Sequence, residues 1–491
     1  MYLVGRQNGL DILEHCFSTK KPEFIAVYGR RRVGKTYLIR EFFSKKQGII
    51  FFNATGSKDG TLQEQIAHFT SQLGEAFFGS AKLQQEKNWD GTFKTLTDAI
   101  KNAPKDKKIV LFLDEIPWMA TKNSRLLQSL DYYWNQHWSN DPRIKLIICG
   151  SSSLWILDKV INNHGGLHNR VTETLRLEPF NLSETKNFLH HAGIKLNHKQ
   201  ITQLYMIMGG IPYYLNKIKK GLSATQMIES LAFRKDNFFI KEFDNLFSSL
   251  FERYQDYIDI IKVIAAHRYG IGQDALFQKV STSAKGSGGL AKLKALEEAG
   301  FIMSFKPTYH KKKGIYYKVI DEFTLFYLSW VEPLRETLLK GGMKKGYWDK
   351  QQLSSAWKSW TGYAFEAICY KHIFQISDAL HLSPTAIPTT WRYIPKKNSN
   401  ENGAQIDLLF DRDDDAITVC EIKYTDQAFQ IDKQYAKKLL SKVDVFKKRT
   451  KTEKQLFISM ICASGLQPSM YSEEIITNTV VLDDLFKPRD E

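Results

Sequence analysis

The sequence predicts an α/β fold whose N-terminal part is built on a parallel β-sheet, with helical domains and a second α/β domain after it. Three short apolar runs rich in β-forming residues predict buried strands, at residues 24–28, 108–115 and 143–153. The first run leads into a glycine-rich loop and an amphipathic helix, which is the arrangement of a P-loop. The chain has 491 residues, which is enough for several domains.

The glycine-rich loop has the Walker A pattern, Gly29-x-x-x-x-Gly34-Lys35-Thr36. Strand, loop and helix together predict a phosphate site, because the N–H groups of the loop and the helix N-terminus face an anion. We expect Lys35 to reach the β- and γ-phosphates of ATP and the Thr36 hydroxyl to hold Mg²⁺. The loop residues expected to contact ATP are Gly29, Arg30, Arg31, Arg32, Val33, Gly34, Lys35 and Thr36.

The second apolar run ends in Asp114 and Glu115, which is the Walker B pattern. We expect Asp114 to hold Mg²⁺ through its water shell and Glu115 to orient or deprotonate the attacking water. The alternative is an acidic strand end that caps the next helix. The run follows the Walker A loop by about 80 residues, and this spacing favours the catalytic interpretation.

The third apolar run ends in small polar residues, and an arginine follows it at a distance. Ser151 or Ser152, at the carboxyl end of a central strand, could sense the γ-phosphate. The same serines could instead cap the helix that starts near Leu154. Arg170 could supply an arginine finger to a γ-phosphate, or be an ordinary surface residue.

Two domains without catalytic motifs are expected next. A helical pattern from Asn181 to Phe239, broken at Gly209-Gly210-Ile211-Pro212, predicts a helical lid. Helices followed by a β-hairpin predict a winged helix-turn-helix over residues 251–325. The stretch from Met303 to Lys318 has five lysines and no acid. We therefore favour DNA contact through this wing, although winged helices also serve as packing modules.

The motifs up to residue 240 resemble the archaeal-type ATPase branch of the AAA+/STAND P-loop NTPases. The resemblance rests on VGR near the start, GRRRVGKT, FLDEIPW, ICGSSS, LEPF and GGIPYYL. In that family the GGxP segment of the lid lies near the nucleotide. The resemblance therefore implies that Gly209, Gly210 and Pro212 help to close the ATP pocket.

A second set of polar residues lies near the C-terminus. A helix at residues 361–374 carries Glu366, a strand at 404–410 carries Asp407, and a strand at 416–423 ends in Glu421-Ile422-Lys423. The two-residue period of a strand places Glu421 and Lys423 on one face, and a hairpin can bring Asp407 beside Glu421. Two carboxylates with a nearby lysine can hold Mg²⁺ and polarise a water.

This set looks like that of the PD-(D/E)xK nuclease fold, which occurs after a winged helix in the same ATPase family. The resemblance implies that Asp407 and Glu421 bind the metal and that the Ile422 carbonyl adds a ligand. Lys423 would orient the water or stabilise the pentacovalent phosphate, and Glu366 matches the carboxylate on the family's first helix. Ile406 stands where the motif has proline.

Composition points to a polyanionic partner. The chain has 69 Lys and Arg against 53 Asp and Glu, a net charge of +16. This charge suits DNA better than a membrane, because no lipidation signal or basic amphipathic anchor is visible. Five scattered cysteines without a CxxC pair, and no apolar leader, indicate a reducing cytoplasm. A homo-oligomer or a protein partner is also compatible with the sequence.

The leading hypothesis is an ATP-hydrolysing DNA-processing enzyme whose nucleotide state controls a tethered Mg²⁺-dependent nuclease. One alternative is a STAND-like switch or DNA-bound regulator whose C-terminal domain grips nucleic acid without cutting, and another is a signalling or defence ATPase. The expected domains are a P-loop ATPase at 1–180, a helical lid at 181–250, a winged helix at 251–325, a linker at 326–355 and a PD-(D/E)xK nuclease-like domain at 356–491.

Overall fold

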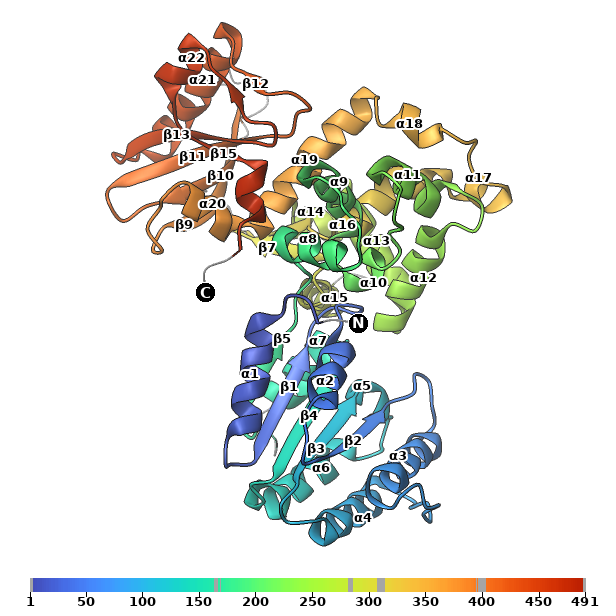
Figure 1. Ribbon diagram of the computed structural model, residues 1–491. Helices are drawn as coiled ribbons and strands as arrows, with labels where there is room; N and C mark the ends of the chain where they lie inside the picture. Colours follow the sequence, from blue (N-terminus) through green and yellow to red (C-terminus); the bar gives the residue numbers. More distant parts are fainter. Residues whose placement is uncertain are drawn as a thin grey trace. The chain divides into compact units, whose positions relative to one another are not determined.

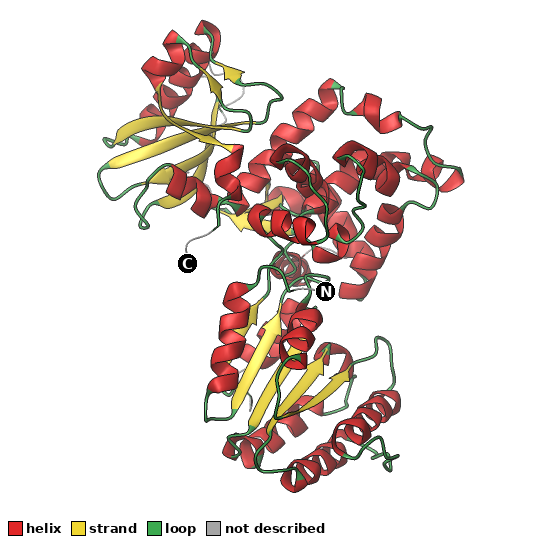
Figure 2. Cartoon of the chain, in the orientation of Figure 1, coloured by secondary structure: helices red, strands yellow, loops and turns green. Residues whose placement is uncertain are grey.

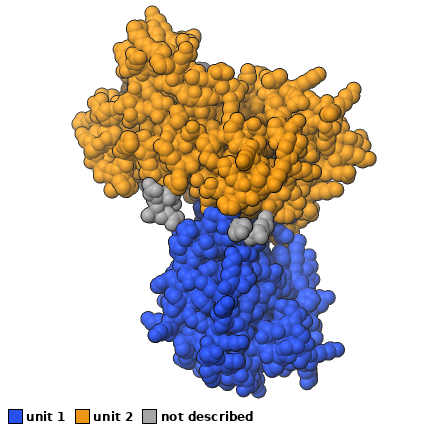
Figure 3. All heavy atoms as spheres, in the orientation of Figure 1, with its two compact units in different colours: residues 1–179, 294–299 blue, residues 180–293, 300–491 orange. Residues whose placement is uncertain are grey.

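The computed structural model describes residues 3–162, 167, 169–280, 286–306, 314–393, 395 and 403–488. They form two compact units (Figure 3). The first unit comprises Met1–Pro179 and Lys294–Ala299, and the second comprises Phe180–Leu293 and Gly300–Glu491. Lys311, Lys312 and Lys313, the lysines expected at the wing tip, lie outside the described residues.

The first unit is built on a five-stranded sheet in which every neighbouring pair is parallel (Figures 1 and 2). The strand order is β2-β3-β4-β1-β5. The three strands expected from apolar runs are all present, and their carboxyl ends meet at one edge of the sheet. The strands are β1 (Glu23–Tyr28), β2 (Ile49–Thr55), β3 (Lys108–Asp114), β4 (Ile144–Gly150) and β5 (Glu173–Arg176).

Helices pack on this sheet around an aromatic core. Trp89 and Phe93 of α4 and Phe69 of α3 are fully buried, and the Phe69 and Trp89 ring centroids lie 5.5 Å apart. Thr61 is the N-cap of α3 and forms a capping box with Glu64, and α4 begins separately at Trp89. The helices are α1 (Gln7–Ser18), α2 (Lys35–Ser44), α3 (Leu62–Phe77), α4 (Trp89–Asn102), α5 (Ile116–Met119), α6 (Leu126–Gln136) and α7 (Ser153–Ile156).

The second unit begins with helices, and the expected break at the glycine pair is present. Gly209 ends α9 and Pro212 is the first residue of α10. A Cβ on Gly210 would lie 1.7 Å from the Phe180 carbonyl oxygen, so this close approach requires glycine. The helices are α8 (Leu182–His191), α9 (His198–Met208), α10 (Pro212–Leu215), α11 (Ala224–Ile228) and α12 (Phe238–Leu250).

Three helices and a small antiparallel sheet follow. The sheet has the order β6-β8-β7, and β7 pairs with β8 from Ile302–Val319 to Phe305–Tyr316. The elements are α13 (Tyr254–Ala265), β6 (Ile271–Gly272), α14 (Gln273–Lys279), α15 (Gly286–Glu298), β7 (Ile302–Phe305) and β8 (Tyr316–Val319).

The segment 326–355, which we expected to be a linker, is helical and packed. Trp348 is fully buried, stacks on Phe233 with ring centroids 4.9 Å apart, and meets Trp357 edge-on at 4.8 Å. Aromatic residues of this size bury 150–250 Å² each, so they draw the segment into the core. The helices here are α16 (Glu322–Phe326), α17 (Arg335–Lys340) and α18 (Tyr347–Gln351), with a π-helix at Tyr327–Val331 and a 3₁₀ turn at Glu332–Leu334.

The C-terminal part has its own five-stranded mixed sheet, of order β15-β13-β11-β10-β9. The pairs β9–β10 and β10–β11 are antiparallel, whereas β11–β13 and β13–β15 are parallel. The helix α19 (Ser355–Lys371) precedes the sheet, and α21 (Lys433–Thr450) connects the parallel strands. The other elements are α20 (Ile373–Ala379), β9 (Ile387–Tyr393), β10 (Ala404–Asp411), β11 (Ala416–Lys423), β12 (Phe429–Gln430), β13 (Gln455–Cys462), β14 (Leu466–Gln467), α22 (Met470–Ile475) and β15 (Ile476–Val481).

Among the helices of the described ranges, none combines the length and the apolar character needed to cross a membrane.

A buried histidine links the C-terminal part to helix α8 within the second unit. The Nε2 atom of His372 accepts a hydrogen bond from the Leu182 backbone N–H at 3.0 Å. Nδ1 lies 2.8 Å from the Ile368 carbonyl oxygen and therefore carries the proton. Burial lowers the pKa of His372 to about 4. The native state thus holds neutral His372, while the unfolded chain takes up a proton below pH about 6.5.

We predict that His372→Gln reduces the loss of stability in acid. Between pH 6.5 and 4 the unfolded state binds more protons at this residue, so the free energy of unfolding falls as the pH falls. Between pH 7 and 4.5 the free energy of unfolding of the parent should fall by roughly 2–3 kcal/mol more than that of the variant. Urea unfolding at the two pH values measures this difference. His191→Gln, at an exposed position, is the control. Identical pH dependence in parent and H372Q would contradict the assignment.

Candidate functional site

The P-loop needs glycine at two positions for different reasons. Gly29 has a φ of 141°, and a Cβ there would lie 2.2 Å from the Leu177 carbonyl oxygen. Gly34 has a φ of 95° with open space around it, so only its backbone conformation requires glycine. Gly34 is also the N-cap of α2. The loop therefore closes tightly against the segment after β5 and directs the N-terminus of α2 into the site.

Lys35 and Thr36 of the Walker A motif both bond to residues of the same site, and their contacts to phosphate and Mg²⁺ stay a prediction. The Lys35 ammonium is buried and donates to the carbonyl oxygens of Gly29 at 2.8 Å and Arg30 at 3.0 Å. The Thr36 hydroxyl donates to an Asp114 carboxylate oxygen at 2.7 Å. A hydroxyl and a carboxylate this close supply hard oxygen ligands, which fit Mg²⁺.

Glu115 and Ser151 bind each other across the sheet edge. Glu115 has a φ of 49°, an uncommon conformation for a residue with a side chain. Its Oε2 accepts from the Ser151 backbone N–H at 3.0 Å and from the Ser151 hydroxyl at 2.9 Å. Ser152 is the N-cap of α7 but makes no side-chain capping bond. Ser151 thus orients Glu115, and sensing of the γ-phosphate by this serine stays a prediction.

The arginines differ in their surroundings. Arg30 is buried, and the Arg31 guanidinium lies 5.6 Å from the Trp118 ring centroid. Arg32 has a left-handed backbone with a φ of 71°. Arg170 is exposed in a turn, so its role as an arginine finger stays a prediction. Val33 is buried within the loop.

Sequence reasoning missed Arg6. Its Nη2 donates to the Val33 carbonyl oxygen at 2.9 Å, and its Nη1 donates to the Glu178 carbonyl. Arg6 therefore fastens the P-loop backbone to the end of the first unit. Arg6 belongs to the VGR motif of the family resemblance. Its left-handed backbone, with a φ of 69°, could not be predicted from the sequence.

Gly210 and Pro212 belong to the second unit, whereas the P-loop belongs to the first. Gly210 accepts a hydrogen bond from the Phe180 backbone N–H at 2.7 Å, and the Tyr205 hydroxyl donates to the Phe180 carbonyl at 2.8 Å. These bonds join the GGIP and LEPF segments to each other. A contribution of Gly210 and Pro212 to the nucleotide pocket stays a prediction.

The C-terminal acids lie where adjacent strands face each other. The antiparallel register pairs Leu408 of β10 with Cys420 of β11. One residue further, this register sets Asp407 opposite Glu421. Burial and the neighbouring Glu421 carboxylate raise the pKa of Asp407. Two carboxylates at facing positions repel each other, and a divalent cation would relieve that repulsion.

Glu421 is held by three partners, of which sequence reasoning found one. Lys423 pairs with it at 2.9 Å, the Tyr435 hydroxyl donates to it at 2.6 Å, and Lys442 forms a further ion pair. Burial opposes ionisation of Glu421, but the two lysines outweigh it and hold its pKa at about 2. Tyr435 and Lys442 lie on α21. Tyr435 and Lys442 are 14 and 21 residues from Glu421 in the sequence, so the pattern around Glu421 did not predict them.

Glu366 of α19 belongs to this cluster and pairs with Lys318, which comes from the small sheet. Burial and the Asp407 carboxylate raise the pKa of Glu366 to about 7. Lys318 of β8 is buried and lies 3.8 Å from a Glu366 oxygen. The Lys318 ammonium also lies 5.0 Å and 4.9 Å from the ring centroids of Tyr363 and Tyr370. The sequence predicts Lys318 only as one of the basic residues of the wing.

The donor set of this acid cluster suits a hard cation. Asp407, Glu421 and the Ile422 carbonyl are all oxygen donors, which Mg²⁺ prefers. Within the described ranges, no group of three or more His, Cys, Asp or Glu side chains converges closely enough to hold a metal alone. A Mg²⁺ ion would thus take two carboxylates and complete its shell with backbone oxygen and water.

Comparison with known proteins identifies the first part of the chain. Residues 3–218 match a family of ATPase domains found predominantly in Archaea, so this part is an archaeal-type ATPase domain. An uncharacterised protein of Methanocaldococcus jannaschii is 26% identical over 429 residues, which are 86% of this chain and 88% of that protein. An uncharacterised ATP-binding protein of the same organism is 46% identical over 44 residues, 9% of this chain and 75% of that protein.

Two solved structures are similar at lower identity. The Walker-type ATPase of Pyrococcus abyssi is 18% identical, with a TM-score of 0.47 over 66% of this chain and 96% of that chain. The Aeropyrum pernix ORC2 protein in its ADPNP–ADP complexes is 14% identical, with a TM-score of 0.43 over 69% of this chain and 96% of that chain.

We predict that Lys35→Ala weakens ATP binding about 100-fold. The substitution removes an ammonium that would contact two phosphates, and charge-assisted hydrogen bonds are the stronger kind. Titration of the full-length protein with ATP by calorimetry measures the affinity. Lys45→Ala is the matched control, because Lys45 is an exposed lysine of the same region that pairs with Glu41 at 3.0 Å. Equal affinities for K35A and K45A would contradict the placement of the phosphates.

We predict that Glu115→Gln retains ATP binding and lowers hydrolysis by about 10²–10⁴-fold, because the amide no longer deprotonates or orients the water. Glutamine preserves the side-chain shape and can still accept from Ser151. Release of labelled phosphate in a single turnover checks hydrolysis, and filter retention checks the bound ATP. If E115Q turned over ATP at the parent rate, another residue would be the base.

Proposed function

We propose that the protein is an ATP-hydrolysing DNA-processing enzyme in which the nucleotide state of the ATPase domain controls a Mg²⁺-dependent nuclease site in the C-terminal part. The observation that supports the nuclease is the cluster of Glu366, Asp407, Glu421 and Lys423 on a helix and two adjacent strands. A DNA substrate is supported by the net charge of +16.

The ATPase residues have distinct tasks in this proposal. Lys35 leaves the loop carbonyls and pairs with the β- and γ-phosphates, while Thr36 and Asp114 hold Mg²⁺. Glu115 takes a proton from the attacking water or orients it. Ser151 keeps the Glu115 carboxylate aimed across the sheet edge until a γ-phosphate competes for the serine hydroxyl.

The acid cluster would work on a phosphodiester. A bound Mg²⁺ supplies an activated water and neutralises charge on the phosphate. Asp407 and Glu421 hold the cation, and Lys423, which stays protonated, donates to the water or to the phosphate oxygens. Glu366, with its raised pKa, accepts or returns a proton near this site.

DNA contact is assigned to the helices and sheet that precede this domain. The order α13-β6-α14-α15-β7-β8 with its antiparallel sheet supports a winged helix. In such a module a helix enters the major groove and the wing contacts phosphates. Lys306, an exposed residue at the end of β7, would be one wing contact.

One observation favours a second candidate function, a DNA-bound ATP switch that does not cut. Glu421 already has two lysines and a tyrosine as partners. A carboxylate whose charge is compensated in this way has less to gain from a metal. In that case the same lysines serve to grip phosphates, and the ATPase domain only changes the affinity for nucleic acid.

We predict that Mg²⁺ or Mn²⁺, added to the full-length protein without ATP, raises its melting temperature, and that Asp407→Ala abolishes the rise. The same variant should lower cleavage of supercoiled plasmid at least about 100-fold and leave ATP hydrolysis unchanged. Lys423→Ala should retain the metal-dependent rise, because the ligands remain, and lose cleavage.

Asp444→Asn is the control for Asp407→Ala, because Asp444 is an exposed acid on α21 of the same domain. It should leave metal binding and cleavage at the parent level. A parent protein that shows neither metal stabilisation nor cleavage of linear, nicked or branched DNA would replace the nuclease with the switch.

A further inference from the structure

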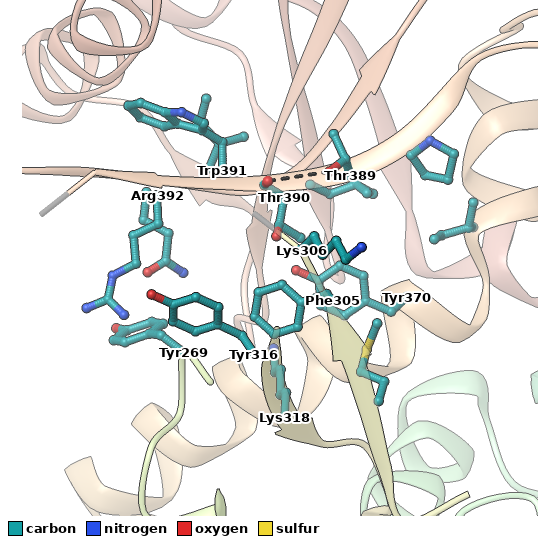
Figure 4. A pocket seen from close by; sticks show the side chains of 16 residues that line it. Tyr269, Phe305, Lys306, Tyr316, Lys318, Tyr370, Thr389, Thr390, Trp391 and Arg392 are labelled. Atoms are coloured by element: carbon teal, nitrogen blue, oxygen red, sulfur yellow. Dashed lines mark hydrogen bonds between the residues drawn. The ribbon is translucent and has the colours of Figure 1, made fainter. Parts of the chain in front are cut away.

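A pocket lies in the second unit where β7 and β8 of the small sheet face β9 and β10 of the large sheet (Figure 4). Its volume is about 210 Å³. Pockets for drug-sized ligands have roughly 300–1,000 Å³, so this one suits a single ring system rather than a larger molecule.

The lining of the pocket is aromatic and basic. Five aromatic and three cationic residues line it; the aromatic residues are Tyr269, Phe305, Tyr316, Tyr370 and Trp391. The cations are Lys306, Lys318 and Arg392, and no Asp or Glu is among the described lining residues. Figure 4 shows the rings of Tyr269, Phe305, Tyr316 and Tyr370 on one side of β9 and the Trp391 ring on the other. That ring packs on Phe446 with centroids 5.1 Å apart.

Two features make the pocket rim suited to a flat ring next to an anion. Tyr269 is half exposed, and the Arg392 guanidinium lies 4.8 Å from its ring centroid. Phe305 and Tyr316 lie with their centroids 5.9 Å apart and their planes tilted by 36°. Aromatic faces stack on nucleobases, and lysine or arginine beside them pairs with phosphate.

Three lining residues also contact the acid cluster directly. Lys318 lies 3.8 Å from Glu366, Gln405 donates to an Asp407 carboxylate oxygen at 3.2 Å, and the Tyr370 hydroxyl donates to the Asp407 carbonyl. The pocket is therefore one side chain away from Glu366 and Asp407. A base held in the pocket would bring its own backbone phosphate to these carboxylates.

We propose that this pocket binds one unpaired nucleotide of a DNA strand, with its base against the aromatic rings and its phosphate toward the acid cluster. The proposal rests on the proposed function, because the neighbouring acids are those of the nuclease site. A base pair is too large for the pocket, so the strand must be single, frayed or locally opened at this point. Unstacking a base costs a few kcal/mol, which makes strand ends and mismatches the preferred substrates.

The test measures binding with the metal removed, so that cleavage plays no part. Fluorescence anisotropy of full-length protein in EDTA is recorded with labelled (dT)₁₂ and with a 12-base-pair duplex. Tyr269→Ala should weaken (dT)₁₂ binding about tenfold and leave duplex binding unchanged. Tyr269→Phe should bind like the parent, because it keeps the ring. Tyr254→Ala removes an exposed tyrosine outside the pocket and should have no effect.

A charge variant gives an independent measurement. Lys306→Ala should weaken (dT)₁₂ binding and lower the slope of log affinity against log salt by about 0.7, the value for one phosphate contact on a single strand. Unchanged (dT)₁₂ binding by Tyr269→Ala, or an equal loss on single strand and duplex, would overturn the proposal. Displacement of (dT)₁₂ by dTMP at equal concentration, in a Lys35→Ala background, would also overturn it in favour of a free nucleotide.

Failure of the pocket and failure of the nuclease give different results. If Tyr269→Ala weakens binding of the single strand only, and no DNA is cleaved in Mg²⁺, the pocket proposal is supported and the nuclease proposal is overturned. Cleavage in Mg²⁺ together with binding that ignores Tyr269 would overturn the pocket and retain the nuclease.

Discussion

The nucleotide site depends on the parallel pairing of β4 between β1 and β3. This pairing sets Tyr28 beside Gly150 and Leu113 beside Ile148, so the P-loop, the Walker B acids and Ser151 leave the sheet at one level. The hydrogen bonds from Thr36 to Asp114 and from Ser151 to Glu115 are possible only in this register. A shift of one strand by one residue would turn the acidic side chains to the opposite face.

In the C-terminal part the acid cluster depends on the balance between buried carboxylates and the lysines around them. Glu366, Asp407 and Glu421 are three partly or fully buried carboxylates, and three lysines from different elements surround them: Lys318, Lys423 and Lys442. Burying a charge is costly unless it is paired. The distribution is uneven, because Glu421 pairs with two lysines, whereas Asp407 accepts a hydrogen bond from the neutral amide of Gln405. This asymmetry leaves one carboxylate strongly ionised beside two that resist ionisation.

Local patterns in the sequence were enough to predict the strands. They did not reveal the site residues whose partners lie far away in the sequence. The strands expected at 24–28, 108–115, 404–410 and 416–423 followed from short apolar runs, and Asp407 and Glu421 lie on the strands expected for them. Arg6, Lys318, Lys442 and Tyr435 could not be found in that way, because each meets its partner through the fold rather than through spacing. The segment at 326–355 differs from the expected linker because Trp348 packs on Phe233 and Trp357, which lie outside the segment.

Lys318 determines how this chain can be divided and recombined. Its strand belongs to the small sheet, yet its ammonium lies against Glu366, Tyr363 and Tyr370 of α19. A C-terminal domain cut out after Val319 would expose two tyrosine faces and leave Glu366 without its cation. In an exchange of modules between proteins, the acid cluster would therefore retain its surroundings only if it were inherited together with the β7–β8 hairpin.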